Sequence, residues 1–455
     1  MTTPATALQS LNLTELADQL ASGRITSMQL VEEALAAIEA PGGEGGSCFI
    51  QVHAERSRAE AAHVDAQRRA GQLLPVLAGI PVSLKDLFDE AGVTTLGGSR
   101  AMVGEPAATQ DSPVVTRLRE AGAILIGRTN MVEFAYSGLG VNPHYGTPLS
   151  VFDRASGRIP GGSTSGGAIS VSDGMAAAAI GSDTGGSLRI PAALNGLVGF
   201  KPTQRRIPLD HVMPLATSFD SAGAIGRTVQ DCALLDAILA GETPSDFQSL
   251  SLSSLRLAVP RAYFLDDLSP DVASAFARAL SRLSAAGATI VELEMPEFAA
   301  TPDINPRGMV TAVEAYAFHR DLIERKADLY DPRVLGRIRT GAPVLAADYA
   351  HRLNLRRAYI AAVNRAAAGF DAMLMPTTPD TAPTIAEVTA SDEAYYRFNG
   401  RMLRNPSAVN SFDGCALSVP CHEADKAPVG LMIAGCAGTD AHILAVGGAI
   451  ESVVA

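Results

Sequence analysis

Short apolar segments that alternate with helix-like patterns constrain the fold of this chain more than any other feature. Six of them, each four to seven residues long, have the length and composition of buried strands; they span residues 123–126, 255–259, 288–293, 371–375, 416–420 and 429–435. Between them lie longer stretches with helical periodicity. This alternation predicts an α/β protein with a central, largely buried sheet.

Several helix boundaries are also readable. Asn12 with Glu15, and Thr26 with Gln29, have the spacing of capping boxes, which predicts two helices near the start of the chain. Ser112-Pro113 and Ser269-Pro270 each place a capping residue and a first-turn proline before a helix. We expect a loop at 41–47 and a surface connection at 241–254.

Composition excludes several classes of function. The chain has 455 residues and a net charge of −12, and it has no basic run long enough to follow a nucleic-acid backbone. It has neither a secretory leader pattern nor an apolar run of membrane-spanning length. The five cysteines form no C-x-x-C pair and the eight histidines form no zinc motif. We therefore expect a cytoplasmic protein without a metal or organic cofactor, and without nucleic-acid or membrane partners.

Lysine is scarce, so each lysine invites explanation. Only four of the 36 Lys and Arg residues are lysines, and Lys85 alone lies inside an apolar, strand-like segment, LLPVLAGIPVSLKDLFDE. Burial favours neutral lysine and lowers its pKa, a shift that arginine does not make. Neutrality at pH 7 requires a drop of about 3 units. The alternative is a structural ion pair between Lys85 and Asp86 or Asp89.

The segment from Pro160 to Arg189, PGGSTSGGAISVSDGMAAAAIGSDTGGSLR, carries glycine and serine at both ends. A flexible linker would be polar throughout, whereas the apolar middle of this segment predicts a short helix and a strand that pack. Glycine pairs also allow backbone N–H groups to approach a ligand. No Walker A sequence and no G-x-S-x-G nucleophile elbow is present here. The segment therefore reads as part of a functional site.

These residues resemble the amidase signature family. The resemblance rests on GIPVSLKDLFD (79–89), PGGSTSGG (160–167) and GSDTGGSLRIPAALNGLVGFKPT (181–203), supported by residues 129–148 and 427–435. It covers nearly the whole chain in the expected order. It implies a single large α/β/α domain with a central mixed β-sheet covered by helices. In that domain the catalytic core is expected at about 70–235, a variable substrate-pocket region at about 300–412, and a sheet-completing segment at about 413–455.

The resemblance implies a triad of two serines and a lysine. Ser187 in TGGS corresponds to the nucleophile, Ser163 in GGSTSGG to a serine that follows a cis peptide bond, and Lys85 in SLKD to the base. Thr164 departs from the pattern, because many members have a second serine there. Backbone N–H groups of the turn beside Ser187 would form an oxyanion hole; the positions implied are Thr184, Gly185 and Gly186.

Further residues receive supporting roles. We expect Asp183 and Arg189 to pair across the turn that carries Ser187, and Ser182 to contact Lys85. Met131 and Tyr136, from TNMVEFAYS, are expected to line the acyl pocket, although such side chains are more often part of a core. Residues 314–338 are a further source of pocket wall.

The function implied is hydrolysis of the C–N bond in carboxylic amides through an acyl-enzyme, with carbamates, urea-like compounds or esters as related substrates. The partner expected is therefore a small amide-type molecule. An alternative is the A-type subunit of a tRNA-dependent amidotransferase, in which the same triad releases ammonia from glutamine. The chain has few residues after 427–435, which favours a stand-alone enzyme. A binding protein without activity is disfavoured because all three triad positions are filled. The sequence leaves the oligomeric state open, with a homodimer among the states considered.

Overall fold

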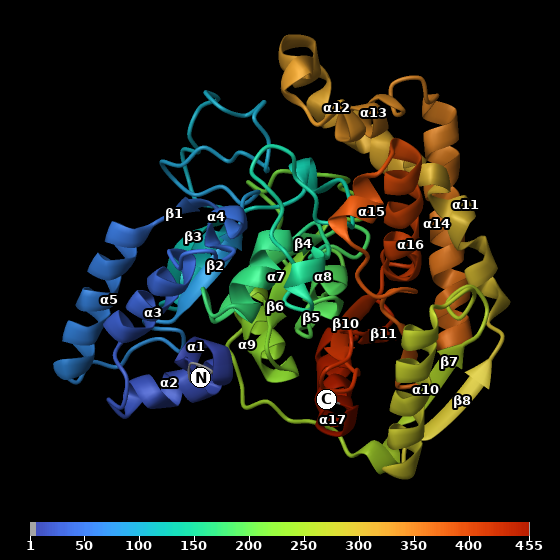
Figure 1. Cartoon of the computed structure of the whole chain (residues 1–455). Helices are drawn as coiled ribbons and strands as arrows, with labels where there is room; N and C mark the ends of the chain where they lie inside the picture. Colours follow the sequence, from blue (N-terminus) through green and yellow to red (C-terminus); the bar gives the residue numbers. More distant parts are fainter. Residues whose placement is uncertain (1–5, 455) are drawn as a thin grey trace.

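The computed structural model describes residues 6–454, and within them one sheet of 11 strands runs through the molecule (Figure 1). Its strands lie in the spatial order β1-β3-β2-β4-β6-β5-β10-β11-β9-β7-β8. Their bounds are β1 Phe49–Val52, β2 Pro81–Lys85, β3 Ile124–Thr129, β4 Ala178–Asp183, β5 Val198–Lys201, β6 Ser221–Gly226, β7 Arg256–Pro260, β8 Thr289–Leu293, β9 Ala372–Pro376, β10 Cys415–Pro420 and β11 Gly430–Gly435.

The sheet is mixed, as predicted. β2 pairs in parallel with both β3 and β4, and β7 pairs in parallel with both β8 and β9. The strands between these two blocks run antiparallel, from the β4–β6 pair to the β11–β9 pair. The six segments predicted as strands are β3, β7, β8, β9, β10 and β11, each within three residues of the expected end.

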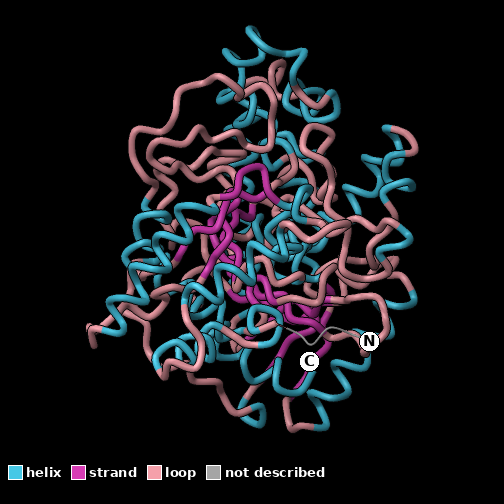
Figure 2. The backbone as a smooth tube through the Cα atoms, turned by 60° about the vertical axis from the view of Figure 1, so that its left-hand side comes forward, coloured by secondary structure: helices cyan, strands magenta, loops and turns pink. Residues whose placement is uncertain are grey.

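Helices cover both faces of the sheet (Figures 1 and 2). The bounds of those with eight or more residues are α2 Leu13–Ala21, α3 Ser27–Ile38, α5 Ala54–Arg69, α6 Pro113–Glu120, α7 Ser165–Ser172, α9 Val229–Ala240, α10 Pro270–Ala285, α12 Met309–Lys326, α13 Pro332–Arg339, α14 Ala346–Ala367, α16 Asp392–Ser411 and α17 Asp440–Val454. The shorter helices are α1 Ala7–Ser10, α4 Gly45–Cys48, α8 Arg189–Ala193, α11 Thr301–Ile304 and α15 Ile385–Thr389.

The strands sort their side chains by the period of two. In β9, Ala372 and Leu374 pack with α9, α10 and α17 in one apolar cluster. Met373 and Met375 point to the opposite face and pack with α14 and α16. A sheet buried on both faces gives strands with continuous apolar runs, which is why their positions were visible in the sequence.

The predicted helix starts are present. Asn12 and Thr26 form capping boxes with Glu15 and Gln29, at the starts of α2 and α3. The Ser112 side chain accepts from the N–H of Val115, and α10 begins at Pro270 as expected. The expected loop at 41–47 is shorter than predicted, because α4 begins at Gly45. No helix in the described range is both long enough and apolar enough to cross a membrane.

Candidate active site

Lys85 is the last residue of β2, and its side chain is fully buried. Its Nζ donates hydrogen bonds to Ser163 Oγ over 2.7 Å and to Ser182 Oγ over 2.8 Å. Burial lowers the pKa of Lys85 to about 7, an effect that the nearby carboxylates of Asp183 and Asp220 oppose. The predicted contact with Ser182 is therefore present, and the amine is balanced between its charged and neutral forms near neutral pH.

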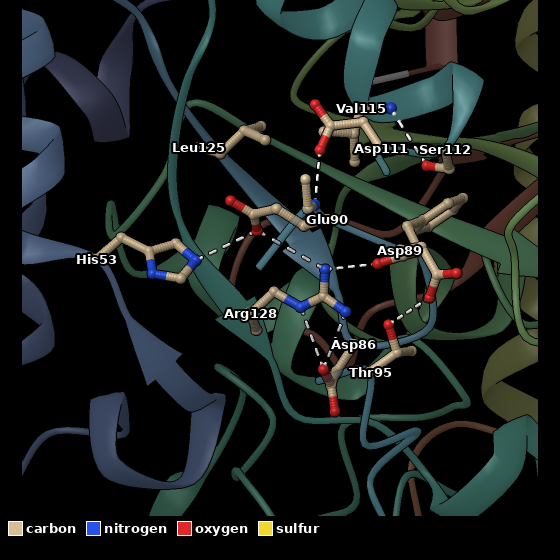
Figure 3. A network of polar contacts seen from close by, with 12 residues as sticks. His53, Asp86, Asp89, Glu90, Thr95, Asp111, Ser112, Val115, Leu125 and Arg128 are labelled. Atoms are coloured by element: carbon tan, nitrogen blue, oxygen red, sulfur yellow. Dashed lines mark hydrogen bonds and ion pairs between the residues drawn. The ribbon is translucent and has the colours of Figure 1, made fainter. Parts of the chain in front are cut away.

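The alternative ion pair of Lys85 with Asp86 or Asp89 is wrong. Asp86 accepts from Arg128 Nε over 3.1 Å, and the hydroxyl of Thr95 donates to Asp89 over 2.6 Å. Figure 3 shows Arg128 between Asp86 and Glu90. Its Nη1 also donates to the carbonyl of Phe88 over 2.6 Å. Arg128 thus neutralises the carboxylates that follow β2, and it fixes the chain just beyond Lys85.

Ser163 is buried and follows a cis peptide bond with Gly162. Its carbonyl accepts from the N–H of Val132 over 3.2 Å. The N–H of Thr164 donates to the carbonyl of Ser187 over 3.3 Å. The two ends of the Gly/Ser segment, separated in sequence by α7 and β4, therefore lie against each other.

The turn after β4 is held by a buried ion pair. Arg189 donates from Nε and Nη2 to the two carboxylate oxygens of Asp183, at 3.0 and 2.9 Å, and both side chains are excluded from solvent. Asn410 of α16 donates to the same carboxylate over 2.9 Å and accepts from Arg189 over 2.7 Å. The predicted pairing of Asp183 with Arg189 is thus present. The guanidinium holds the pKa of Asp183 well below its usual range, against the opposing effect of burial.

Ser187 lies on the wall of a cavity of about 610 Å³, together with Thr184 and Gly185. The N–H of Gly186 instead donates to Asp183 over 2.8 Å, and Gly186 is not among the residues that line this cavity. Of the three expected oxyanion donors, Thr184 and Gly185 therefore border this cavity, whereas the N–H of Gly186 is directed to Asp183. Gly186 uses its N–H to shape the turn, because the Asp183 carboxylate lies beneath it.

Tyr136 and Met131 differ in position. Tyr136 lines the cavity, and the guanidinium carbon of Arg337 lies 4.0 Å from the centre of its ring. Met131 is fully buried in the core, and its carbonyl accepts from Asn142 over 2.7 Å. It does not line either of the two cavities beside the turn.

A second cavity, of about 480 Å³, shares Thr184 with the first as a wall residue. Its wall includes Ser182, Thr184 and Asp220, together with a mostly apolar stretch at 207–215. Asp220 is buried, and burial raises its pKa to about 7. Sequence reasoning missed Asp220, and also Asn410, because nothing in their local sequence distinguishes them from other polar residues.

Comparisons with known proteins show the family to which the chain belongs. The model of the Amidase family matches residues 29–444. The chain is 36% identical to 2-amino-5-chloromuconic acid deaminase from Comamonas testosteroni, over 88% of this chain and 87% of that protein. It is 32% identical to the A-type subunit of glutamyl-tRNA(Gln) amidotransferase from Cupriavidus taiwanensis, over 97% of this chain and 96% of that one.

A solved structure leads to the same result. A crystal structure described as an amidase superposes with a TM-score of 0.89 at 31% identity, covering 98% of this chain and all of the other. The resemblance of the glycine- and serine-rich segments thus extends to the whole sheet and to its helices. The chain belongs to the amidase family, and it is an amidase acting on carbon–nitrogen bonds.

Proposed function

We propose that this amidase hydrolyses carboxylic amides with Ser187 as nucleophile, Ser163 as proton relay and Lys85 as general base. The observation that carries the proposal is the hydrogen bond from the fully buried Lys85 to Ser163. The next residue, Thr164, donates its N–H to the carbonyl of Ser187. A serine hydroxyl needs a base to become a useful nucleophile. Neutral Lys85 supplies that base, and serine–lysine pairs follow the same logic as serine–histidine pairs.

The proposed reaction proceeds in two halves. Ser187 Oγ attacks the amide carbon while its proton passes to Ser163, and the proton of Ser163 passes to Lys85. The C–N bond then breaks, and the leaving amine takes a proton back from Lys85 through Ser163. In the second half a water molecule gives its proton to the same relay and attacks the acyl-enzyme. The bond to Ser187 Oγ then breaks, the relay returns the proton to Ser187, and the carboxylic acid is released.

The turn would stabilise the negative oxygen of each tetrahedral intermediate. Thr184, Gly185 and Ser187 border the cavity, so their N–H groups are the proposed donors. The buried pair of Asp183 with Arg189 would keep the turn in place through both halves of the reaction.

We propose carbamates, urea-like compounds and esters as further substrates, because they undergo the same acyl transfer. We place the catalytic core at about 70–235, the variable cavity wall at about 300–412 and the sheet-completing part at about 413–455. The five cysteines, all free in the structure, fit a reducing cytoplasmic setting. A homodimer remains part of the proposal.

The test combines labelling with turnover. A fluorophosphonate probe should label the purified protein at Ser187, as located by peptide mass spectrometry, and Ser187→Ala should lose both label and amide hydrolysis. Ser407→Ala is the matched control, because Ser407 lines the same cavity and should leave the label in place. Labelling at another serine would overturn the assignment.

A second candidate, the A-type subunit of a tRNA-dependent amidotransferase, is favoured by the relative from Cupriavidus taiwanensis. The purified chain alone, assayed against short amides, anilides and carbamates, distinguishes the two. Turnover without a partner supports the stand-alone amidase. Glutamine hydrolysis that appears only with partner proteins and charged tRNA would support the amidotransferase.

A further inference from the structure

Three arginines line the cavity that holds Ser187: Arg307, Arg337 and Arg404. Among the described residues, no aspartate or glutamate lines it with them, although the chain as a whole carries a net charge of −12. Within residues 6–454 none of the three forms a salt bridge. Positive groups left without carboxylate partners in a cavity beside a nucleophile suggest an anionic ligand.

Two other arginines on the same helices, Arg333 and Arg401, do have carboxylate partners. On α13, Arg333 pairs with Asp392 over 2.8 Å, whereas Arg337, one turn later, faces the cavity. On α16, Arg401 donates to Asp380 over 2.7 Å and also pairs with Asp267, whereas Arg404 lines the cavity. Among the described residues, Arg337 and Arg404 thus turn to the cavity without a carboxylate partner, whereas Arg333 and Arg401 of the same helices have one.

Arg404 is held by one edge of its guanidinium. Nε donates to the side-chain oxygen of Asn405 over 3.0 Å, and Nη2 donates to the carbonyl of Phe264 over 3.3 Å. Nη1 makes no hydrogen bond to any described residue. A guanidinium fixed in this way loses little freedom when its other edge binds a carboxylate.

Arg337 and Arg307 add positive charge to the same cavity from other elements. Arg337 stacks on Tyr136 and donates from Nη1 to the carbonyl of that residue, which leaves Nε and Nη2 without partners among the described residues. Arg307 is exposed at the cavity wall, in the short turn of Pro306–Gly308. These groups lie on a part of the wall contributed by residues 301–411, whereas Ser187 lies on the turn after β4.

We propose that this site selects amides that carry a carboxylate away from the scissile bond, with Arg404 as the main contact and Arg337 and Arg307 in support. The substrate class is thus the monoamides of dicarboxylic acids. This inference rests on the proposed function, because it assumes that Ser187 attacks the amide at the other end of the same cavity. A paired, hydrogen-bonded charge contributes more to binding than a neutral contact of similar size.

The first test compares matched substrates. Succinamate and butyramide differ only by carboxylate in place of methyl, and so do glutaramate and valeramide. We expect kcat/KM for the better acid to exceed that for its neutral partner by about 10- to 100-fold. Arg404→Gln should remove most of that ratio, because it should lower kcat/KM for the acid far more than for its neutral partner. Arg401→Gln and Arg333→Gln are the matched controls and should retain it. Equal kcat/KM for acid and neutral amides in the wild type would overturn the proposal.

A binding measurement separates this inference from the proposed function. In the Ser187→Ala background, calorimetry should detect glutarate or succinate but not glutaramide or succinamide, and Arg404→Gln should weaken that binding about tenfold or more. If the acids bind but the wild-type protein hydrolyses no amide, the anion site is supported and the proposed chemistry is wrong. If Ser187 is labelled and the wild-type protein hydrolyses neutral amides but the acids do not bind, the chemistry is supported and the anion site is wrong. Circular dichroism and thermal melting of each variant verify that it is folded.

Discussion

Thr184 donates a hydrogen bond of 2.5 Å from Oγ1 to Oδ1 of Asp220. The other oxygen of Asp220 accepts from the N–H groups of Leu215 and Ala216, both over 3.0 Å. One buried carboxylate therefore ties the turn of Ser187 to the wall of the second cavity. The same carboxylate raises the pKa of Lys85, against the larger lowering by burial.

Asp220→Asn should shift the pH profile without dismantling the site. The amide can keep its oxygen toward the two N–H groups and turn its NH2 toward the Thr184 hydroxyl, so the geometry survives while the charge is lost. Asp220 has a pKa of about 7, so it carries its charge mainly above that pH. Removing this charge lowers the pKa of Lys85, so the acid limb of kcat/KM should move to lower pH by less than about one unit. Thr184→Val, which keeps the charge, should lower kcat and leave that limb in place. A move to higher pH in Asp220→Asn would contradict the coupling.

The wild-type rate should itself follow the protonation of Lys85. With a pKa of about 7, the neutral base is lost as pH falls below 7, and kcat/KM should decline about tenfold per unit in that range. Above pH 8 the rate should reach a plateau. Lys85→Arg should be inactive throughout, because arginine stays protonated. A profile that is flat down to pH 5 would rule out a lysine base.

Lys85 should also cost stability. Its pKa is about 7 in the folded protein and about 10.5 when the chain is unfolded, so the unfolded state binds the extra proton between these values. The free energy of unfolding therefore falls as pH decreases from 10.5 to 7, and this contribution is constant below 7. Lys85→Met removes it. Relative to wild type, the variant should gain stability as pH falls from 10 to 7, with no further gain below. Urea titrations at pH 6, 7, 8 and 9.5 measure this, and a pH-independent difference would contradict it.

Two neighbouring glycines should respond differently to alanine. Gly186 has φ of +126°, and a Cβ there would lie 2.6 Å from Pro406 and 2.8 Å from Ile190. A Cβ at Gly185 would meet nothing closer than 3.4 Å. Gly186→Ala should therefore lower the free energy of unfolding by about 1–3 kcal/mol, more than Gly185→Ala does. Chemical denaturation of both variants measures the difference, and equal losses would argue against the packing described.

Unusual local patterns pointed to Lys85 and to the two Gly/Ser loops, and the resemblance to the amidase signature family supplied the predicted roles of Lys85, Ser163 and Ser187. A lone lysine in an apolar strand and serines bracketed by glycines remain visible without any structure. The hydrogen-bond partners of Lys85 were harder to predict from the residues alone, because Ser163 and Ser182 lie 78 and 97 positions away while Asp86 is adjacent. Only the pairing of β2 with β4 and the charge of Arg128 decide between them.

Strand β6 could not be predicted from the sequence for a different reason. Its sequence, SAGAIG, is composed mostly of small residues and has little preference for strands. The reason is packing, since a Cβ at Gly223 would lie 2.3 Å from the carbonyl oxygen of Phe200 in β5. The position of the arginines on the cavity wall could not be predicted for a related reason. Arg333 and Arg337 have similar sequence surroundings, and only the fold brings a carboxylate, that of Asp392, next to Arg333.

The division of the cavity between two parts of the chain has an evolutionary consequence. Lys85 ends strand β2 and the turn of Ser187 follows the neighbouring strand β4, so the reactive groups share one rigid support. The arginines come from the short turn Pro306–Gly308, from α13 and from α16, which contribute another part of the cavity wall. Mutations at these three arginines can therefore alter the preferred acid while the reaction centre stays unchanged. A library randomised at 307, 337 and 404 offers a direct route to new amidase specificities from this scaffold.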